Sequence, residues 1–250
     1  MVPELSAGTG AVGREGVVTT APRTAAQLRA VDAPAWPAIA ARVEAAGATV
    51  RPADLDRRDA ALERLQVTTR SPLGAVVAET GAVRVDHGWL TLLGAGTADL
   101  PGVVAASPWR GAEPPPWLVV GYDVLGGRFA VNGGGLAGEP GEVCHLGVDT
   151  LGWVGIGGGY GEFVEYVLTG GLADLHAALR WPGWEAEVAA LADGVGLAVF
   201  PFPFTEEGAD LGAAHRAPAP YGQLHAVYDD LAQQLSMVPG AGTVDDASGP

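Results

Sequence analysis

The amino-acid sequence predicts an α+β domain, with a mainly antiparallel sheet of about six strands flanked by N-terminal and C-terminal helices. Two observations carry this prediction. Apolar residues recur at helical spacing near both ends of the chain, whereas its middle consists of short β-rich runs separated by glycine turns. Helices and strands are therefore grouped in separate stretches instead of alternating, which is typical of α+β folds.

The composition favours one domain with a substantial core, since 48% of the 250 residues are hydrophobic. We expect this domain to span residues 24–236, between a disordered leader at residues 1–23 and a disordered tail at residues 237–250. No apolar run approaches the roughly 20 residues that cross a bilayer. The leader also lacks the basic start and apolar segment of a secretory signal. Together with the single cysteine, these features predict a cytoplasmic protein.

Two helices are predicted before the strands. Asp32 precedes apolar residues at helical spacing, and Gly47 follows them, so these two residues mark the start and stop of the first helix. Asp54 is the expected cap of the second helix, which carries leucines on one side and charged residues on the others.

The strands are predicted from β-rich runs between turn signals. Gly126-Gly127 between two such runs indicates a hairpin, and the Gly/Pro-rich residues 94–116 indicate a long loop. The expected strands occupy residues 73–93 in two or three pieces, 117–122, 128–132, 142–146, 151–156 and, as the last one, 196–200.

Helices return after residue 160. Apolar residues at 163–179 and a short segment at 181–191 follow the helical period, and residues 221–235 close the domain as an amphipathic helix. Trp181 and Trp184 lie three residues apart at the start of the short helix, and we expect them to be core anchors.

The charge is strongly one-sided, with 29 acidic against 14 basic residues and a net charge of −15. Binding to nucleic acid needs a basic patch, and none appears along the sequence, so nucleic acid and anionic membranes are not expected partners. A basic protein partner would complement the negative net charge, although an acidic surface can equally serve only to keep the protein in solution. Every basic residue is Arg. The absence of Lys excludes Schiff-base chemistry and a lysine-containing phosphate loop.

Two glycine-rich segments resemble cofactor loops but do not fit them. The segment 133–138 has the spacing of a dinucleotide-binding loop, yet the residues after it predict a strand and not the helix that would hold a pyrophosphate. The segment 155–161 does open a helix, but Glu162 would occupy the positive end of its dipole. Both segments are interpreted as turns, and no cofactor is predicted.

The reactive side chains form no recognisable catalytic or metal motif. Cys144 and His145 are neighbours in a predicted strand, so they point to opposite faces and cannot form a dyad. Cys144 is expected to be a buried structural residue. The other histidines, at positions 87, 176, 215 and 225, show no metal-ligand spacing. No metal site and no catalytic residue are predicted.

The remaining candidates are polar groups near predicted turns and strand ends. Arg70 belongs to a polar cluster, residues 68–72, that is expected to redirect the chain, although its guanidinium suits a carboxylate ligand. Asp86 and His87 lie at a predicted hairpin tip. The binding candidates are Arg70, Asp86, His87, Asp123, Arg128 and Asn132.

Several segments together resemble a known bacterial family. They include Leu-Gln-Val-Thr-Thr-Arg-Ser-Pro-Leu-Gly-Ala at residues 65–75 and Asp-His-Gly-Trp-Leu at residues 86–90. The others lie at residues 126–134, 179–185, 200–202 and 206–208. In this order they resemble the domain of unknown function 2625, over roughly residues 24–235. The family has no established activity to carry over.

A more distant similarity is to the SUKH superfamily, the Smi1/Knr4-like group. It is carried by the hairpin at residues 117–134, the strand at 142–146 and the helix at 161–168. This resemblance implies a SUKH-like α+β fold. It also implies a role in immunity, since bacterial members often neutralise polymorphic toxins.

The functional hypothesis is a non-enzymatic protein-binding module that neutralises a basic toxin, whose recognition complementary charge would accelerate. The alternative is an enzyme whose site assembles from distant residues such as Asp86, His87, Arg128 and Asn132. A third hypothesis is a homo-oligomeric module. The sequence fixes neither the partner nor the oligomeric state.

Overall fold

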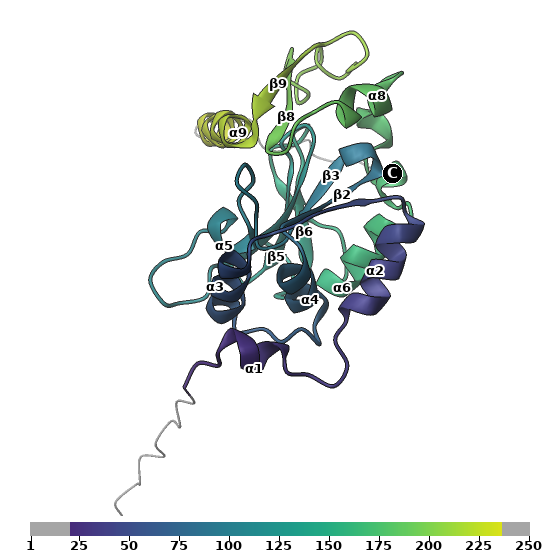
Figure 1. The fold of residues 1–250 in the computed structure, drawn as a ribbon. Helices are drawn as coiled ribbons and strands as arrows, with labels where there is room; N and C mark the ends of the chain where they lie inside the picture. The colour runs from purple at the N-terminus through teal and green to yellow at the C-terminus, as the bar shows by residue number, and fades with distance from the viewer. Residues whose placement is uncertain (1–20, 237–250) are drawn as a thin grey trace, which may run out of the picture.

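A computed structural model describes residues 21–236 and shows a seven-stranded antiparallel sheet (Figure 1). The strands follow one another in the sheet in the order of the sequence, so the sheet is a continuous meander. They are β1 (Thr49–Arg51), β2 (Ala82–Val85), β3 (Leu90–Leu93), β4 (Trp117–Asp123), β5 (Arg128–Asn132), β6 (Val143–Leu146) and β7 (Trp153–Gly155). The α+β class and the antiparallel sheet are confirmed. The expected leader and tail fall mostly outside the described residues.

The helices are α1 (Ala25–Arg29), α2 (Trp36–Ala45), α3 (Leu55–Leu65), α4 (Pro72–Glu79), α5 (Val103–Ala106), α6 (Tyr160–Leu168), α7 (Leu172–Leu175), α8 (Trp184–Ala189) and α9 (Tyr221–Ser236). The helices before residue 80 and α6 pack below the seven-stranded sheet in the view of Figure 1, whereas α8 lies above it beside a smaller unit that contains α9. Helix α4 contacts α2, α3 and α6 and so joins the lower layer. Within residues 21–236, no helix is both long and apolar enough to cross a membrane.

The two N-terminal helices form as predicted, with one different boundary. Asp54 caps α3, because its side chain accepts a hydrogen bond of 2.7 Å from the amide of Arg57. Helix α2 instead begins after Ala35, without a side-chain cap and with Pro37 in its first turn. Asp32 is therefore not the cap of α2.

The largest error concerns residues 73–79, which were predicted as strand and belong to α4. Ser71 starts this helix by accepting a hydrogen bond of 3.0 Å from the amide of Gly74, and Pro72 occupies the first helical position. Residues 74–78 are all buried. A helix buried on every side shows no apolar stripe, and a short apolar run is then read as a strand.

The hairpins of the sheet form where turns were predicted. Between β2 and β3 the chain turns through the short 3-10 segment η1 (Asp86–Gly88). Between β4 and β5 it turns through Gly126, whose φ of +97° suits glycine. Residues 133–138 form a loop and residues 155–161 a strand-to-helix turn, as predicted.

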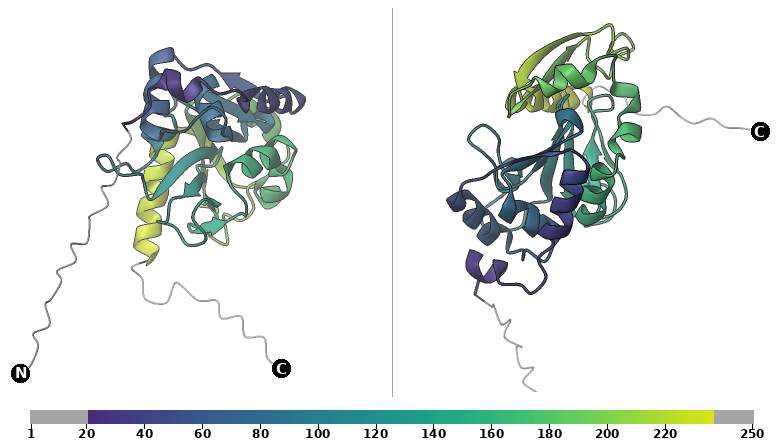
Figure 2. Two further views of the ribbon diagram at one scale, coloured as in Figure 1. Left: turned by 90° about the horizontal axis from the view of Figure 1, so that it is seen from below. Right: turned by 45° about the vertical axis from the view of Figure 1, so that its right-hand side comes forward.

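A two-stranded sheet, β8 (Val195–Phe200) and β9 (His215–Pro220), forms the smaller unit together with α9. The right-hand view of Figure 2 shows this unit above the main sheet. It is tied to the β4–β5 hairpin by a hydrogen bond of 2.7 Å from the amide of Leu197 to the carbonyl of Val124. Strand β9 was not predicted, so residues 196–200 are not the last strand. Its Pro218 and Pro220 are tolerated only because β9 is an edge strand.

The core is continuous from the lower helices to the smaller unit. Trp89 and Phe129 are the largest fully buried side chains. Trp181 and Trp184 are also buried, which confirms them as core anchors, and both rings contact Trp89. Cys144 is buried and free, as predicted.

Candidate metal centre

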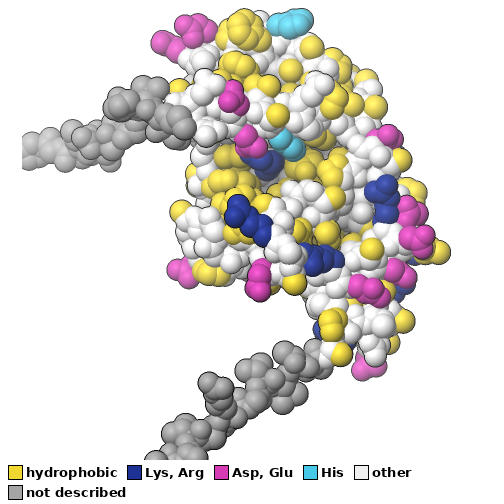
Figure 3. Space-filling model, turned by 90° about the vertical axis from the view of Figure 1, so that its left-hand side faces the viewer, with side chains coloured by type: hydrophobic (Ala, Val, Ile, Leu, Met, Phe, Trp, Pro, Cys, Tyr) yellow, Lys and Arg dark blue, Asp and Glu magenta, His cyan; other side chains and the backbone are white. Residues whose placement is uncertain are grey.

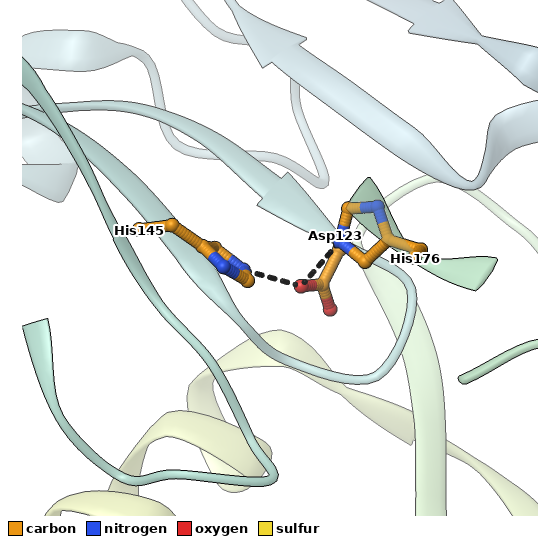
Figure 4. A group of neighbouring side chains, drawn as sticks. All are labelled: Asp123, His145 and His176. Atoms are coloured by element: carbon orange, nitrogen blue, oxygen red, sulfur yellow. Dashed lines mark hydrogen bonds and ion pairs between the residues drawn. The ribbon is translucent and has the colours of Figure 1, made fainter. Parts of the chain in front are cut away.

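Asp123, His145 and His176 meet inside the domain, although 22 and 31 residues separate them along the chain (Figure 4). Asp123 is the last residue of β4, His145 lies on β6, and His176 ends α7. One carboxylate oxygen and one nitrogen from each ring all lie within 4.8 Å of one another. The meander thus brings a polar cluster together beside its own core.

The β4–β5 turn fixes the orientation of Asp123. Its Oδ1 accepts hydrogen bonds from the amides of Leu125, at 3.0 Å, and Gly127, at 2.8 Å. The other oxygen, Oδ2, therefore faces the two imidazole rings. Gly127 is required here, because a Cβ at this position would clash with Oδ2.

The two rings approach the same carboxylate oxygen. His145 Nε2 lies 3.1 Å from Oδ2, and His176 Nε2 lies 3.6 Å from it. Phe129, which pairs with His145 in the sheet register, stacks on the His145 ring with 4.4 Å between centroids. The ring of Trp89 lies 5.5 Å from that of His176. Aromatic packing thus holds both imidazoles in place.

The cluster carries a charge that water barely reaches. The exposed fractions of the side chains are 1% for Asp123, 12% for His145 and 0% for His176. Burial alone would raise the pKa of Asp123, but the facing imidazoles outweigh it and hold this pKa well below its usual range. Asp123 is therefore a buried carboxylate anion.

His176 is the unusual member of the cluster. Both of its ring nitrogens are buried and neither has a hydrogen-bond partner, since 3.6 Å to Asp123 exceeds the normal hydrogen-bond distance. Buried polar groups are paired in about 90% of cases, and an exception points to an ion or water between them. The 3.1 and 3.6 Å separations bracket the roughly 3.4 Å that separates ligand atoms around a tetrahedral ion with bonds of about 2.1 Å.

Asp123 is the one predicted binding residue that belongs to this cluster. Arg128 instead pairs with Asp229 of α9. Asn132 lies at the other end of β5, where its side chain holds the loop that follows. Because β5 spans five residues, these two side chains start about 13 Å apart. The structure does not bring them together in one site.

The other predicted residues lie elsewhere. Arg70 is exposed and makes no ion pair or hydrogen bond with another residue of the described part. Its neighbour Ser71 supplies the helix cap expected of this polar cluster. Asp86 pairs with Arg180, and the exposed ring of His87 meets that of Trp184 edge-on, with 5.7 Å between centroids.

The sequence did not identify His145 and His176 as candidate ligands. Local spacing was the criterion for a metal site, whereas this cluster draws one residue from each of three elements. Only the packing of β4, β5 and β6 with α7 places them together. A local motif search therefore had no signal to find.

The fold and the cluster define a class of protein: an α+β domain on a meandering antiparallel sheet, with an aspartate and two histidines buried at its centre. The chain belongs to the family described as protein of unknown function DUF2625, whose profile matches residues 25–223.

Two bacterial proteins are similar to the chain. An uncharacterised protein of Haemophilus influenzae is 37% identical over 141 residues, which are 54% of this chain and 61% of that protein. The putative uncharacterised protein YbfG of Escherichia coli is 35% identical over 156 residues, or 60% of this chain and 70% of YbfG. No solved structure matches the chain significantly, so the similarity to the SUKH superfamily stays a prediction.

Proposed function

We propose that this domain is a metal-binding protein that holds one divalent transition-metal ion between Asp123, His145 and His176. The observation that carries the proposal is His176, a fully buried imidazole whose two nitrogens lack partners while a buried carboxylate faces it. An ion between these side chains would coordinate one nitrogen of each imidazole and one oxygen of Asp123, and it would neutralise the carboxylate. The earlier prediction of no metal site rested on local spacing only.

The ligand set favours zinc among the available ions. Two imidazoles and one carboxylate supply nitrogen and oxygen ligands, which suit Zn²⁺ and its neighbours better than Ca²⁺ or Mg²⁺. The hydrogen bonds around the ligands also suit a metal ion, because two backbone amides donate to Oδ1 of Asp123. Such hydrogen bonds orient a ligating carboxylate.

The depth of the cluster favours a structural role for the ion. Its ligands come from β4, β6 and the end of α7, so an ion would join the segment after α6 to the middle of the sheet. The side chains are 0–12% exposed, which leaves little access for a substrate.

The test is a competition for Zn²⁺ between the protein and a chromophoric chelator. We expect one Zn²⁺ per chain. His145→Gln and His176→Gln should each weaken binding by more than about 100-fold, since even changes outside the ligands cost about 10–100-fold. The matched control is His215→Gln, which removes an exposed histidine of β9. Equal affinity in all four proteins, or no bound zinc, would sink the proposal.

A second candidate function is the protein-binding module predicted from the sequence, including toxin neutralisation. It is supported by an apolar groove of about 280 Å³ between β8, β9 and α9, beside the exposed side chains of Phe200 and Val227. Apolar side chains reach the surface in the upper part of the molecule as drawn in Figure 3. The net charge of −15 suits a basic partner.

Its test is an affinity capture with residues 24–236 from the lysate of the source species. One basic toxin-like protein, released by salt and lost with Val227→Asp, would support this function. Recovery of the chain itself would indicate a homo-oligomer instead, and recovery of nothing specific would count against the module.

A further inference from the structure

A second polar site lies at η1, where a groove of about 500 Å³ opens between the C-terminal end of α2, strands β1 and β2, and the end of α8. Its volume falls in the range of about 300–1,000 Å³ that small-molecule sites occupy. The polar side chains in its lining are those of Thr49, Arg51, Arg84, Asp86 and His87. Alanines and glycines form the rest of the lining, so a polar ligand fits better than an apolar one.

The turn at η1 presents two of these side chains in a strained backbone. Asp86 and His87 have φ angles of 53° and 58°, in the left-handed region that residues with a Cβ rarely adopt. Consecutive residues in this region persist only where their surroundings impose them, and such residues cluster at ligand sites. Arg180 pairs with Oδ2 of Asp86, and Gly88 packs against the guanidinium of Arg84.

The two arginines of the groove differ in how they are used. The guanidinium of Arg84 donates to the carbonyls of Leu191, at 3.0 Å, and Val188, at 3.3 Å. Arg51 uses Nε, which lies 2.8 Å from a carboxylate oxygen of Asp193. Its two terminal nitrogens have no partner within residues 21–236, and its side chain is 35% exposed. Arg51 therefore offers a free pair of donors to a ligand.

Both signs of charge face the groove. Among the lining side chains, Arg51 and Arg84 are positive and Asp86 is negative, which leaves one positive charge in a chain whose net charge is −15. Asp193 and Arg180 pair with these side chains but do not line the groove. Oδ1 of Asp86 has no partner among the described residues, so an acceptor is available beside the donors of Arg51. A ligand that satisfies both groups carries a carboxylate and a donor cation.

We propose that this groove binds a small zwitterion of the amino-acid type. Its carboxylate meets the two terminal nitrogens of Arg51 in the bidentate manner that guanidinium groups favour. Its ammonium group faces Oδ1 of Asp86. This site shares no residue with the Asp123 cluster and stands independently of the proposed metal function.

The test uses the whole chain and the twenty free amino acids as probes, first by thermal shift and then by isothermal titration calorimetry. At least one should bind saturably, and acetate, methylamine and inorganic phosphate should bind more weakly than that amino acid. Arg51→Gln and Asp86→Asn should each weaken binding by about 10–100-fold, the range of a charged hydrogen bond. Asn tolerates the left-handed backbone at position 86.

The matched control is Arg57→Gln, which removes the charge of an exposed arginine of α3 that pairs with Asp54. It should bind the amino acid as the parent does. Three results would overturn the proposal: no saturable binding by any amino acid at the highest soluble concentration, unchanged affinity in Arg51→Gln, or equal affinity for phosphate.

Discussion

The β4–β5 hairpin has a buried polar residue at each end, and the two ends differ in how their polar atoms are satisfied. At one end, Asn132 donates to the carbonyls of Leu136, Gly138 and Glu139 and accepts from the amides of Gly134 and Leu136. At the other end, both oxygens of Asp123 have hydrogen-bond partners, Oδ1 in the turn amides and Oδ2 in the ring of His145, but the ring of His176 beside Oδ2 is unpaired.

This difference separates a polar residue with a structural role from a residue that we propose to bind a ligand. A buried side chain that uses its whole hydrogen-bonding capacity on the local backbone shapes a loop, and nothing further is needed to explain it. A buried group that leaves atoms unpaired has a cost that the fold alone does not offset. We therefore propose a ligand for the cluster at the Asp123 end, whereas the Asn132 end shapes the loop at residues 133–142.

The largest expected effect is the gain in the free energy of unfolding on metal binding, which variants at the two ends of the β4–β5 hairpin should change differently. At a free Zn²⁺ concentration of about 1,000 times Kd, binding to the native state adds about 4 kcal/mol to the free energy of unfolding. Urea unfolding with buffered Zn²⁺ and with a chelator measures this gain. Asn132→Ala should keep the gain and His176→Gln should lose it. The same gain in both variants would assign the effect to another site.

The next largest expected effect is the difference in stability loss between glycine substitutions at the two ends of the hairpin. Gly127→Ala places a Cβ against Oδ2 of Asp123, and we expect it to lower the free energy of unfolding by about 3 kcal/mol, as overpacking does. At the other end, Gly134→Ala has a φ of +100° but open space around it, so only backbone strain of about 1 kcal/mol is expected. Thermal unfolding of the two variants compares them, and equal losses would contradict the close packing at Asp123.

Asn132→Ala tests the satisfied end directly. Removal of its side chain leaves loop amides and carbonyls that water reaches in part, so we expect a loss of about 2 kcal/mol in the free energy of unfolding. The affinity for Zn²⁺ should not change. Hydrogen exchange should increase at residues 133–142, and an increase around Asp123 instead would show that the ends are not independent.

The pH dependence of the free energy of unfolding distinguishes His225 from Asp123 at the same end of the hairpin. Burial lowers the pKa of His225, which packs on Tyr122, to about 4. Between pH 6.5 and 4 the unfolded chain binds a proton here that the folded chain does not, so the free energy of unfolding falls as the pH falls. We expect a loss of about 2–3 kcal/mol over this window. The loss should vanish in His225→Phe.

Asp123 behaves in the opposite way, because its pKa is lowered in the folded state. Its contribution to stability is present above the unfolded pKa of about 4 and is lost only below it. A loss between pH 6.5 and 4 that persists in His225→Phe would show that a group other than His225 controls this range.

The sequence alone predicted those parts of the fold that local chemistry determines. Asp54 and the glycines at 126 and 127 marked a helix start and a hairpin correctly, because caps and turns depend on near neighbours. The segment 73–79 was misassigned because complete burial hides the helical period, and β9 was missed because its prolines are compatible only with an edge strand. Tertiary packing determined both.

The candidate metal centre was likewise predictable only where it depends on local sequence. Asp123 was selected from its place at a strand end, which is a local feature. His145 and His176 depend on the pairing of β5 with β6 and on the return of α7 to the sheet, and no spacing in the sequence encodes that. Asn132 and Arg128 were selected by the same local criterion as Asp123, but their side chains serve the loop and the contact with α9.

The most direct test of the metal centre is a crystal structure of the protein with one equivalent of Zn²⁺, with diffraction measured at the zinc absorption edge. We predict one anomalous peak about 2.0–2.2 Å from Asp123 Oδ2, His145 Nε2 and His176 Nε2. A peak elsewhere on the chain, or an ordered water bridging His176 and Asp123 with no anomalous signal, would contradict the assignment.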